Sequence, residues 1–110
     1  VKNLLDIYIL QIIKNEPTWG YKIKKKIEQE YGIKLRHGAL YPLLNTLENS
    51  GYLTSRKEKH GGRIRKIYEI TPKGTQYLSA YYKFLSEQIQ TKETETFTGK
   101  LNEKQITTNQ

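Results

Sequence analysis

The sequence predicts a mainly α-helical fold of the α+β class, with three helices, a two-stranded β-hairpin and one further helix. Three observations lead to this prediction. Apolar residues recur at helical spacing in four segments, a Gly-Gly pair at 61–62 separates two stretches typical of strands, and a Thr-Pro pair follows the second stretch. A length of 110 residues is enough for one domain with a single modest core.

The first two predicted helices differ in how much of their surface is apolar. Residues 4–13 are apolar on more than one side, so this helix should be covered from several directions. Pro17 ends it, because the residue before a proline avoids helical angles. The second helix covers residues 18–31, with a lysine-rich side opposite its apolar stripe, and Gly32 fits its C-terminal stop.

The third predicted helix spans residues 38–50. Its leucines at 40, 43, 44 and 47 follow the spacing i, i+3, i+4, i+7. Pro42 is compatible with this helix because it falls near the first, unpaired amides. The side that remains for solvent or a partner carries hydrogen-bonding groups, among them Tyr41, Asn45 and Asn49.

A β-hairpin follows, with predicted strands at 52–59 and 64–70. The turn is centred on the Gly61-Gly62 pair, because paired glycines permit the positive φ that tight turns need. Leu53, Tyr68 and Ile70 are the expected inward residues. The tip and the outer face of the hairpin are almost wholly cationic.

Thr71-Pro72 supplies an N-cap and a first-turn proline for a fourth helix that should end near Gln90. Residues 91–110 are polar with few apolar groups, so we expect a frayed or disordered tail. This order of elements is that of a winged helix-turn-helix. The expected division is a winged-helix DNA-binding domain at 1–71, a dimerisation helix at 72–90 and the tail at 91–110.

The charge favours a polyanionic partner. Nineteen Lys and Arg against eleven Asp and Glu give +8, and residues 91–110 contribute nothing to this excess. Residues 22–36 carry net +4 and residues 56–66 carry net +5, so the cations flank the third helix. A major groove admits one α-helix, and a basic hairpin beside it reaches neighbouring phosphates or the minor groove. Double-stranded DNA is therefore the predicted partner.

Candidate DNA contacts divide into two groups. Base edges are assigned to polar groups at and before the third helix, and phosphates to cations of the second helix and the wing. The predicted DNA-binding residues are Lys22, Lys25, Arg36, His37, Tyr41, Asn45, Arg63, Arg65 and Lys66. For His37 a phosphate contact is favoured over a pH switch.

Other functional classes have less support. One Asp, two separated His and no Cys leave no catalytic constellation and no metal cluster, so we expect no enzyme and no cofactor. The most apolar run, 4–13, is too short to cross a membrane, and no signal peptide is visible, so a cytoplasmic location is expected. Two alternatives stay open: a DNA-coating protein without sequence preference, and a winged helix that binds an acidic protein.

The motifs resemble those of the PadR family of transcriptional regulators over residues 9–78. The resemblance rests on Trp19-Gly20-Tyr21-Lys22-Ile23, Gly38-Ala39-Leu40-Tyr41-Pro42-Leu43-Leu44, Leu47-Glu48 with Gly51-Tyr52-Leu53, and Arg65-Lys66-Ile67-Tyr68-Glu69-Ile70-Thr71. It implies a repressor that binds a palindromic operator. Tyr41 matches the family's recognition-helix tyrosine, Arg65 and Lys66 match the basic wing, and Tyr21 matches a tyrosine of the second helix that should pack.

The resemblance also implies a homodimer formed by the C-terminal helix and the partner's N-terminal helix. A lone helix after a winged domain has few partners within its own chain, which favours the same arrangement. The expected interface residues are Leu4, Tyr8, Leu78, Tyr81, Tyr82, Leu85 and Ile89. Trp19 is interpreted as core, and a small flat effector in an aromatic pocket of this interface is kept as an alternative.

Two features depart from the family's pattern. Arg36 and His37 stand where a Ser-Pro pair often caps the third helix, so a cap oxygen is lost at a cost of about 1 kcal/mol while two donors that can face DNA are gained. The C-terminal region is short and resembles the branch of the family with a single C-terminal helix. A dedicated effector domain is therefore not expected.

Overall fold

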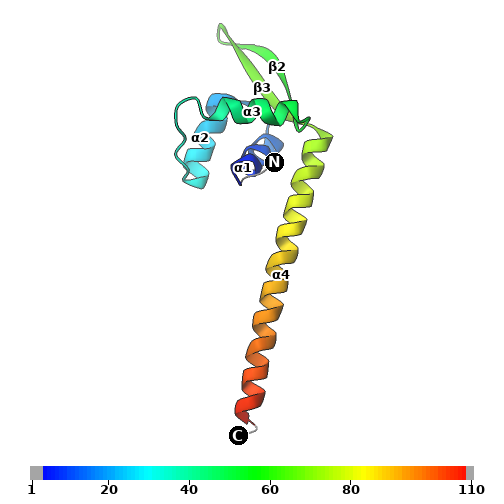
Figure 1. The fold of residues 1–110 in the computed structure, drawn as a ribbon. Helices are drawn as coiled ribbons and strands as arrows, with labels where there is room; N and C mark the ends of the chain where they lie inside the picture. Colours follow the sequence, from blue (N-terminus) through cyan, green and yellow to red (C-terminus); the bar gives the residue numbers. More distant parts are fainter. Residues whose placement is uncertain (1–3, 109–110) are drawn as a thin grey trace. The chain divides into compact units, whose positions relative to one another are not determined.

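The computed structural model describes residues 4–108, with side chains described for residues 4–96. Its elements are α1 (Leu4–Asn15), β1 (Thr18–Trp19), α2 (Gly20–Tyr31), α3 (Leu40–Asn49), β2 (Leu53–His60), β3 (Arg63–Ile70) and α4 (Pro72–Thr108) (Figure 1). The chain forms two compact units, Val1–Leu78 and Ser79–Gln110. The first unit contains every element except most of α4, and the fold is that of a winged helix-turn-helix.

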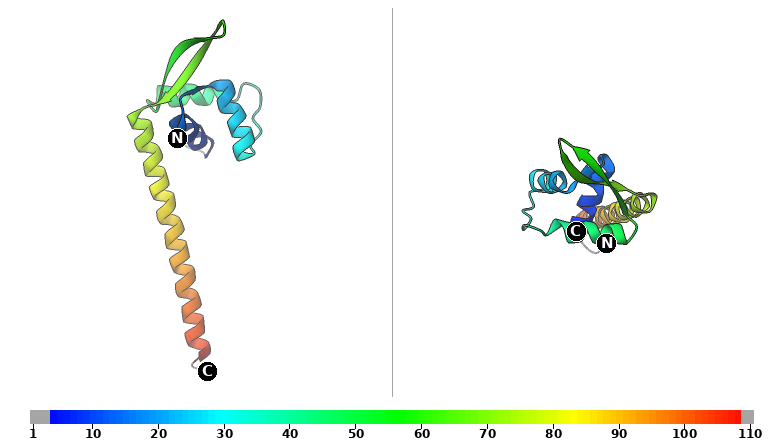
Figure 2. Two further views of the ribbon diagram at one scale, coloured as in Figure 1. Left: turned by 180° about the vertical axis from the view of Figure 1, so that it is seen from behind. Right: turned by 90° about the horizontal axis from the view of Figure 1, so that it is seen from above.

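Helix α1 is the centre of the first unit. Ile9, Leu10 and Ile13 are at most 1% exposed, and α1 contacts both α2 and β3. The prediction of a helix covered from several directions is thus confirmed. In Figure 1 and in the rear view of Figure 2 the hairpin projects beyond α3, on the side away from α1. Helix α3 and the hairpin are therefore left for solvent or a partner.

The sheet has three antiparallel strands in the order β1-β3-β2, not the two that the sequence predicted. Strand β1 contributes only two register pairs, Thr18 with Tyr68 and Trp19 with Ile67. The prediction that α2 begins at residue 18 was therefore wrong, and α2 begins at Gly20. Pairing with β3 holds Thr18 and Trp19 extended, and such a pairing leaves no periodic signal in so short a segment.

The hairpin turn confirms its predicted geometry. His60 and Arg63 are register partners, and the two glycines between them have φ of 55° and 82°. Positive φ at both central residues is the type I′ arrangement that suits a two-residue hairpin. Leu53 and Tyr68 are buried as expected, Ile70 is half-buried, and Ile67 is buried in addition.

Helix α3 begins without a side-chain cap. Ala39 occupies the cap position, in agreement with the expected loss of a cap oxygen at residues 36 and 37. Pro42 is the third residue of the helix, where its missing N–H removes no helical hydrogen bond. Leu40, Leu44 and Leu47 are buried, and they turn the opposite side of α3 outward.

Helix α4 starts as predicted and runs further. The Gly74 amide donates to Thr71 Oγ1 at 3.0 Å, which makes Thr71 the N-cap. The helix continues to Thr108, so its predicted end near Gln90 is corrected. The low apolar content of residues 91–110 indicates little burial, but their Lys, Glu and Gln are good helix formers. The proposed division into domain, dimerisation helix and tail stays a prediction.

Candidate nucleic-acid interface

A hollow of about 610 Å³ lies between α3, the start of α2 and strand β3. Five of the predicted DNA-binding residues line it: Tyr41, Asn45, Arg63, Arg65 and Lys66. Its other lining residues are Trp19, Gly20, Tyr21, Ile64 and Tyr68, so none of the lining residues is acidic. The fold thus brings the polar face of α3 and the cations of the wing to one surface.

Two smaller hollows adjoin the first, because all three share Tyr21. Arg36 and His37 line one of about 240 Å³, and Lys25 lines another of about 290 Å³. Tyr21 is 65% exposed, so the prediction that it packs was wrong. Tyr21 instead lines both the hollow that contains Arg36 and His37 and the hollow on the exposed side of α2.

Tyr41 is positioned by a residue without a side chain. A Cβ at Gly20 would lie 2.8 Å from the ring and hydroxyl of Tyr41, so Gly20 allows the ring to lie against the start of α2. Tyr41 remains 54% exposed. Asn45 follows one helical turn later and is also exposed, so both side chains are available to a ligand of the hollow. Thr46 differs, because its hydroxyl already donates to the Pro42 carbonyl at 3.0 Å.

Lys66 on the hairpin has an acidic partner on α3. Lys66 Nζ lies 3.4 Å from Glu48 Oε1, and the neighbouring Tyr68 phenol, followed by Glu48, raises the pKa of Lys66. Glu48 also accepts a hydrogen bond from Ser55 Oγ at 2.5 Å, which ties α3 to β2. Burial raises the pKa of Tyr68, so its phenol is neutral near pH 7.

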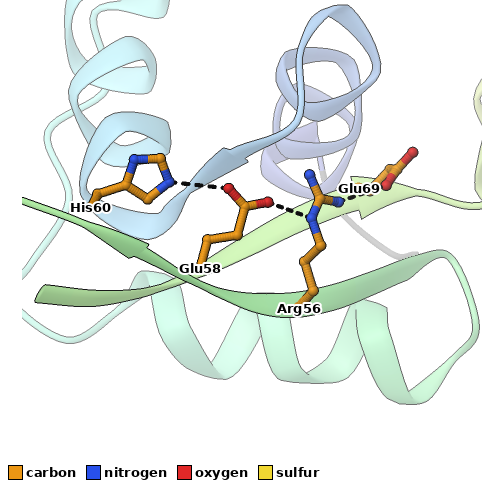
Figure 3. A network of polar contacts seen from close by, with 4 residues as sticks. All are labelled: Arg56, Glu58, His60 and Glu69. Carbon is orange, nitrogen blue, oxygen red and sulfur yellow. Dashed lines mark hydrogen bonds and ion pairs between the residues drawn. The ribbon is translucent and has the colours of Figure 1, made fainter.

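Arg56 belongs to a network on the hairpin rather than to the hollow. Figure 3 shows Glu58 between Arg56 and His60, with Glu69 on the other side of Arg56. Arg56 Nη1 lies 2.9 Å from Glu69 Oε2, and His60 Nε2 lies 3.1 Å from Glu58 Oε1. The hydrogen bond from Arg56, followed by that from His60, lowers the pKa of Glu58. Arg63 and Arg65 form no ion pair with any carboxylate that the structure describes.

Sequence reasoning did not foresee the place of Trp19. Its side chain is only half-buried and lines the hollow instead of lying in the core. Arg65 Cζ lies 4.6 Å and Lys22 Nζ lies 5.4 Å from its ring centroid. The available signal was an aromatic residue directly before the Gly-Tyr-Lys of a basic helix, and only the pairing of β1 with β3 brings Arg65 to it.

The expected dimer residues are divided by the structure. Leu78 is fully buried in the first unit, so its assignment to a subunit interface is corrected. Tyr8 stacks on Tyr31 with ring centroids 4.0 Å apart. The remaining five keep exposed or half-exposed side chains: Leu4, Tyr81, Tyr82, Leu85 and Ile89.

Within residues 4–108 no group of three or more His, Cys, Asp or Glu is placed to hold a metal ion. No helix in that range is long and apolar enough to cross a membrane.

Three helices, a basic wing and a following helix define a winged helix-turn-helix protein. Its outward face combines a polar helix with the cations Arg63, Arg65 and Lys66, of which only Lys66 has an acidic partner among the described residues. The model of the transcriptional regulator PadR-like family matches residues 9–80, and the chain belongs to that family. It is therefore a transcriptional regulator of the PadR family and not an enzyme.

Similar proteins extend over most of the chain. Transcriptional regulator Rv3488 of Mycobacterium tuberculosis is 37% identical over 81 residues, which are 74% of this chain and 75% of that protein. The crystal structure of smu.1704 from Streptococcus mutans is 33% identical, covers 77% of this chain and 78% of its own, and has a TM-score of 0.69. Bacillus subtilis PadR in complex with operator DNA is 28% identical, covers 73% of this chain but 47% of its own, and has a TM-score of 0.67.

Proposed function

We propose that this chain is a homodimeric repressor that binds a palindromic operator in duplex DNA. The observation that carries the proposal is the hollow in which Tyr41 and Asn45 of α3 meet Arg63, Arg65 and Lys66 of the wing without an acidic lining residue. A polar recognition helix beside cations is what base readout combined with phosphate contact requires. The similarity to a PadR protein in complex with operator DNA supports the same partner.

The residues take two roles in this proposal. Asn45, Arg36 and His37 address base edges, because they lie on or just before α3 and are exposed. Arg63, Lys25 and their neighbours hold phosphates and supply affinity without sequence preference. A hydrophobic stripe on α4 supports the homodimer, since Leu85 and Ile89 lie one turn apart on this helix and are 40% and 50% exposed in the single chain.

The test measures fluorescence anisotropy with the upstream region of the chain's own gene and with a scrambled duplex, at about 50–200 mM salt. We expect a preference of roughly a thousandfold or more for the specific duplex. Asn45→Ala should lower affinity for that duplex by about tenfold and leave the scrambled duplex nearly unchanged. Arg63→Ala should weaken both duplexes alike and reduce the log–log salt slope by about 0.9.

Lys92→Ala is the matched control, because it also removes one exposed charge but lies in the second unit. It should leave the preference and the salt slope unchanged. Equal affinity of the unsubstituted chain for both duplexes would indicate a DNA-coating protein instead. Absence of binding to either duplex would favour an acidic protein partner.

A further inference from the structure

Trp19 lies between two elements that carry proposed phosphate contacts, α2 and β3. It ends β1 and precedes Gly20, the first residue of α2. Its register partner on β3 is Ile67, so Arg65 is its diagonal neighbour on the same face of the sheet. Lys22 reaches the ring from the first turn of α2, at 5.4 Å, while Arg65 reaches it at 4.6 Å. Two cations from different elements thus share one indole.

A cation held by an indole keeps its net charge, whereas a cation paired with a carboxylate does not. Lys66 is paired with Glu48, and Arg56 is paired with Glu58 and Glu69, so acidic groups offset much of their charge. The face of a Trp ring attracts a cation through its quadrupole and leaves the net charge in place. Arg65 and Lys22 are therefore ordered without being neutralised.

The terminal N–H groups of Arg65 have no hydrogen-bond partner in the part of the chain that the structure describes. Its Nε is buried without a hydrogen-bond partner, and Arg65 donates no hydrogen bond to any other residue that the structure describes. A guanidinium carries five N–H donors, so its terminal N–H groups stay free for an outside acceptor. The arrangement fits an acceptor with dense negative charge, such as a DNA phosphate.

We propose that Trp19 is a positioning residue that holds Lys22 and Arg65 together as one phosphate-binding pair for the DNA backbone. This inference rests on the proposed function and extends it. Because the pair addresses phosphates, Trp19 contributes to affinity for every duplex and not to discrimination between sequences. Its contribution is expressed only through the two cations, which distinguishes it from a residue that merely stabilises the fold.

The test uses a labelled scrambled duplex at about 50 mM salt, so that no operator needs to be known. Trp19→Leu should weaken binding about fivefold, because the cation–π attraction is lost for both side chains. In a chain that already carries Lys22→Ala and Arg65→Ala, the same substitution should change affinity less than about twofold. Trp19→Leu should also keep the salt slope of the unsubstituted chain, whereas Arg65→Ala should lower it by about 0.9.

Trp19→Phe is the conservative variant, because it keeps an aromatic ring in the same place. Its face attracts cations more weakly, so affinity for the duplex should fall about twofold. Thermal unfolding followed by circular dichroism reports whether each variant is folded. An equal loss from Trp19→Leu with and without the two cations would overturn the inference and leave the proposed function intact, and so would no loss at all. If the unsubstituted chain bound no duplex, the proposed function would fail and the inference with it.

Discussion

Gly74 is needed for close approach and not for a special backbone angle. A Cβ at this position would lie 2.3 Å from the Tyr52 carbonyl oxygen and 2.7 Å from Ile70 Cγ1. The carbonyl has little freedom to move, because it accepts a hydrogen bond from the Thr71 amide at 3.1 Å. Gly74 therefore fixes how closely the start of α4 packs on the residues before β2.

We predict that Gly74→Ala destabilises the protein by roughly 1–3 kcal/mol, as overpacking in a tight site does. The sign of this change in unfolding free energy separates two effects. Helix propensity alone would make the alanine variant more stable by about 1 kcal/mol, whereas overpacking makes it less stable. Urea unfolding followed by circular dichroism measures the difference. Gly20→Ala is the comparison: its added Cβ meets the end of the exposed Tyr41 side chain, which can rotate away, so a smaller loss is expected. A Gly74→Ala chain as stable as the original would contradict the packing argument.

The wing carries a charge network whose state depends on pH. The hydrogen bond from Arg56, followed by that from His60, lowers the pKa of Glu58 below its ordinary value of 4.5. A lowered folded-state pKa means that the contact favours the ionised carboxylate. Its contribution to the wing is present above about pH 4.5 and is lost as the pH falls through the folded-state pKa.

We expect a carbon-detected NMR titration of the Glu58 carboxyl to give a midpoint below 4.5. Arg56→Gln should return that midpoint toward the ordinary value, because the strongest partner is removed. Lys57→Gln is the matched control: it removes the neighbouring charge, which forms none of the described ion pairs, and should leave the midpoint low. A midpoint at or above 4.5 in the unsubstituted chain would refute the role given to Arg56.

The elements differ in how well the sequence predicts them. The leucine spacing of α3, the glycine pair of the hairpin turn and the Thr-Pro start of α4 are local signals, and the structure confirms each. Strand β1 has no such signal, because its two residues are extended only through pairing with β3. Leu78 continues the apolar stripe of α4, and only the packing of the first unit distinguishes this buried residue from the exposed ones that follow.

The candidate site follows from charge and topology together. The cationic segments at 22–36 and 56–66 flank α3 in sequence, and residues from both meet α3 around one hollow and its neighbours. Sequence alone could not separate cations with acidic partners, such as Lys66, from those without, such as Arg63. That distinction depends on where Glu48 and Glu58 fall after folding.

The exposed apolar side chains of α4 favour a homodimer as the DNA-binding form of the regulator. Leu85 is 40% and Ile89 is 50% exposed, so a second copy that covers them would bury apolar area at about 25 cal/mol per Å². We predict that sedimentation equilibrium of the unsubstituted chain gives twice the 12.9 kDa mass of one chain, and that Leu85→Ser with Ile89→Ser shifts it to the single mass. Glu87→Ser with Gln90→Ser changes two exposed polar positions of the same helix and should leave the dimer intact.

A single-chain mass before any substitution would rule out the homodimer, and an operator would then be bound by independent copies. Because a palindrome presents two half-sites related by a two-fold axis, loss of the dimer should also reduce specific affinity more steeply than affinity for scrambled DNA.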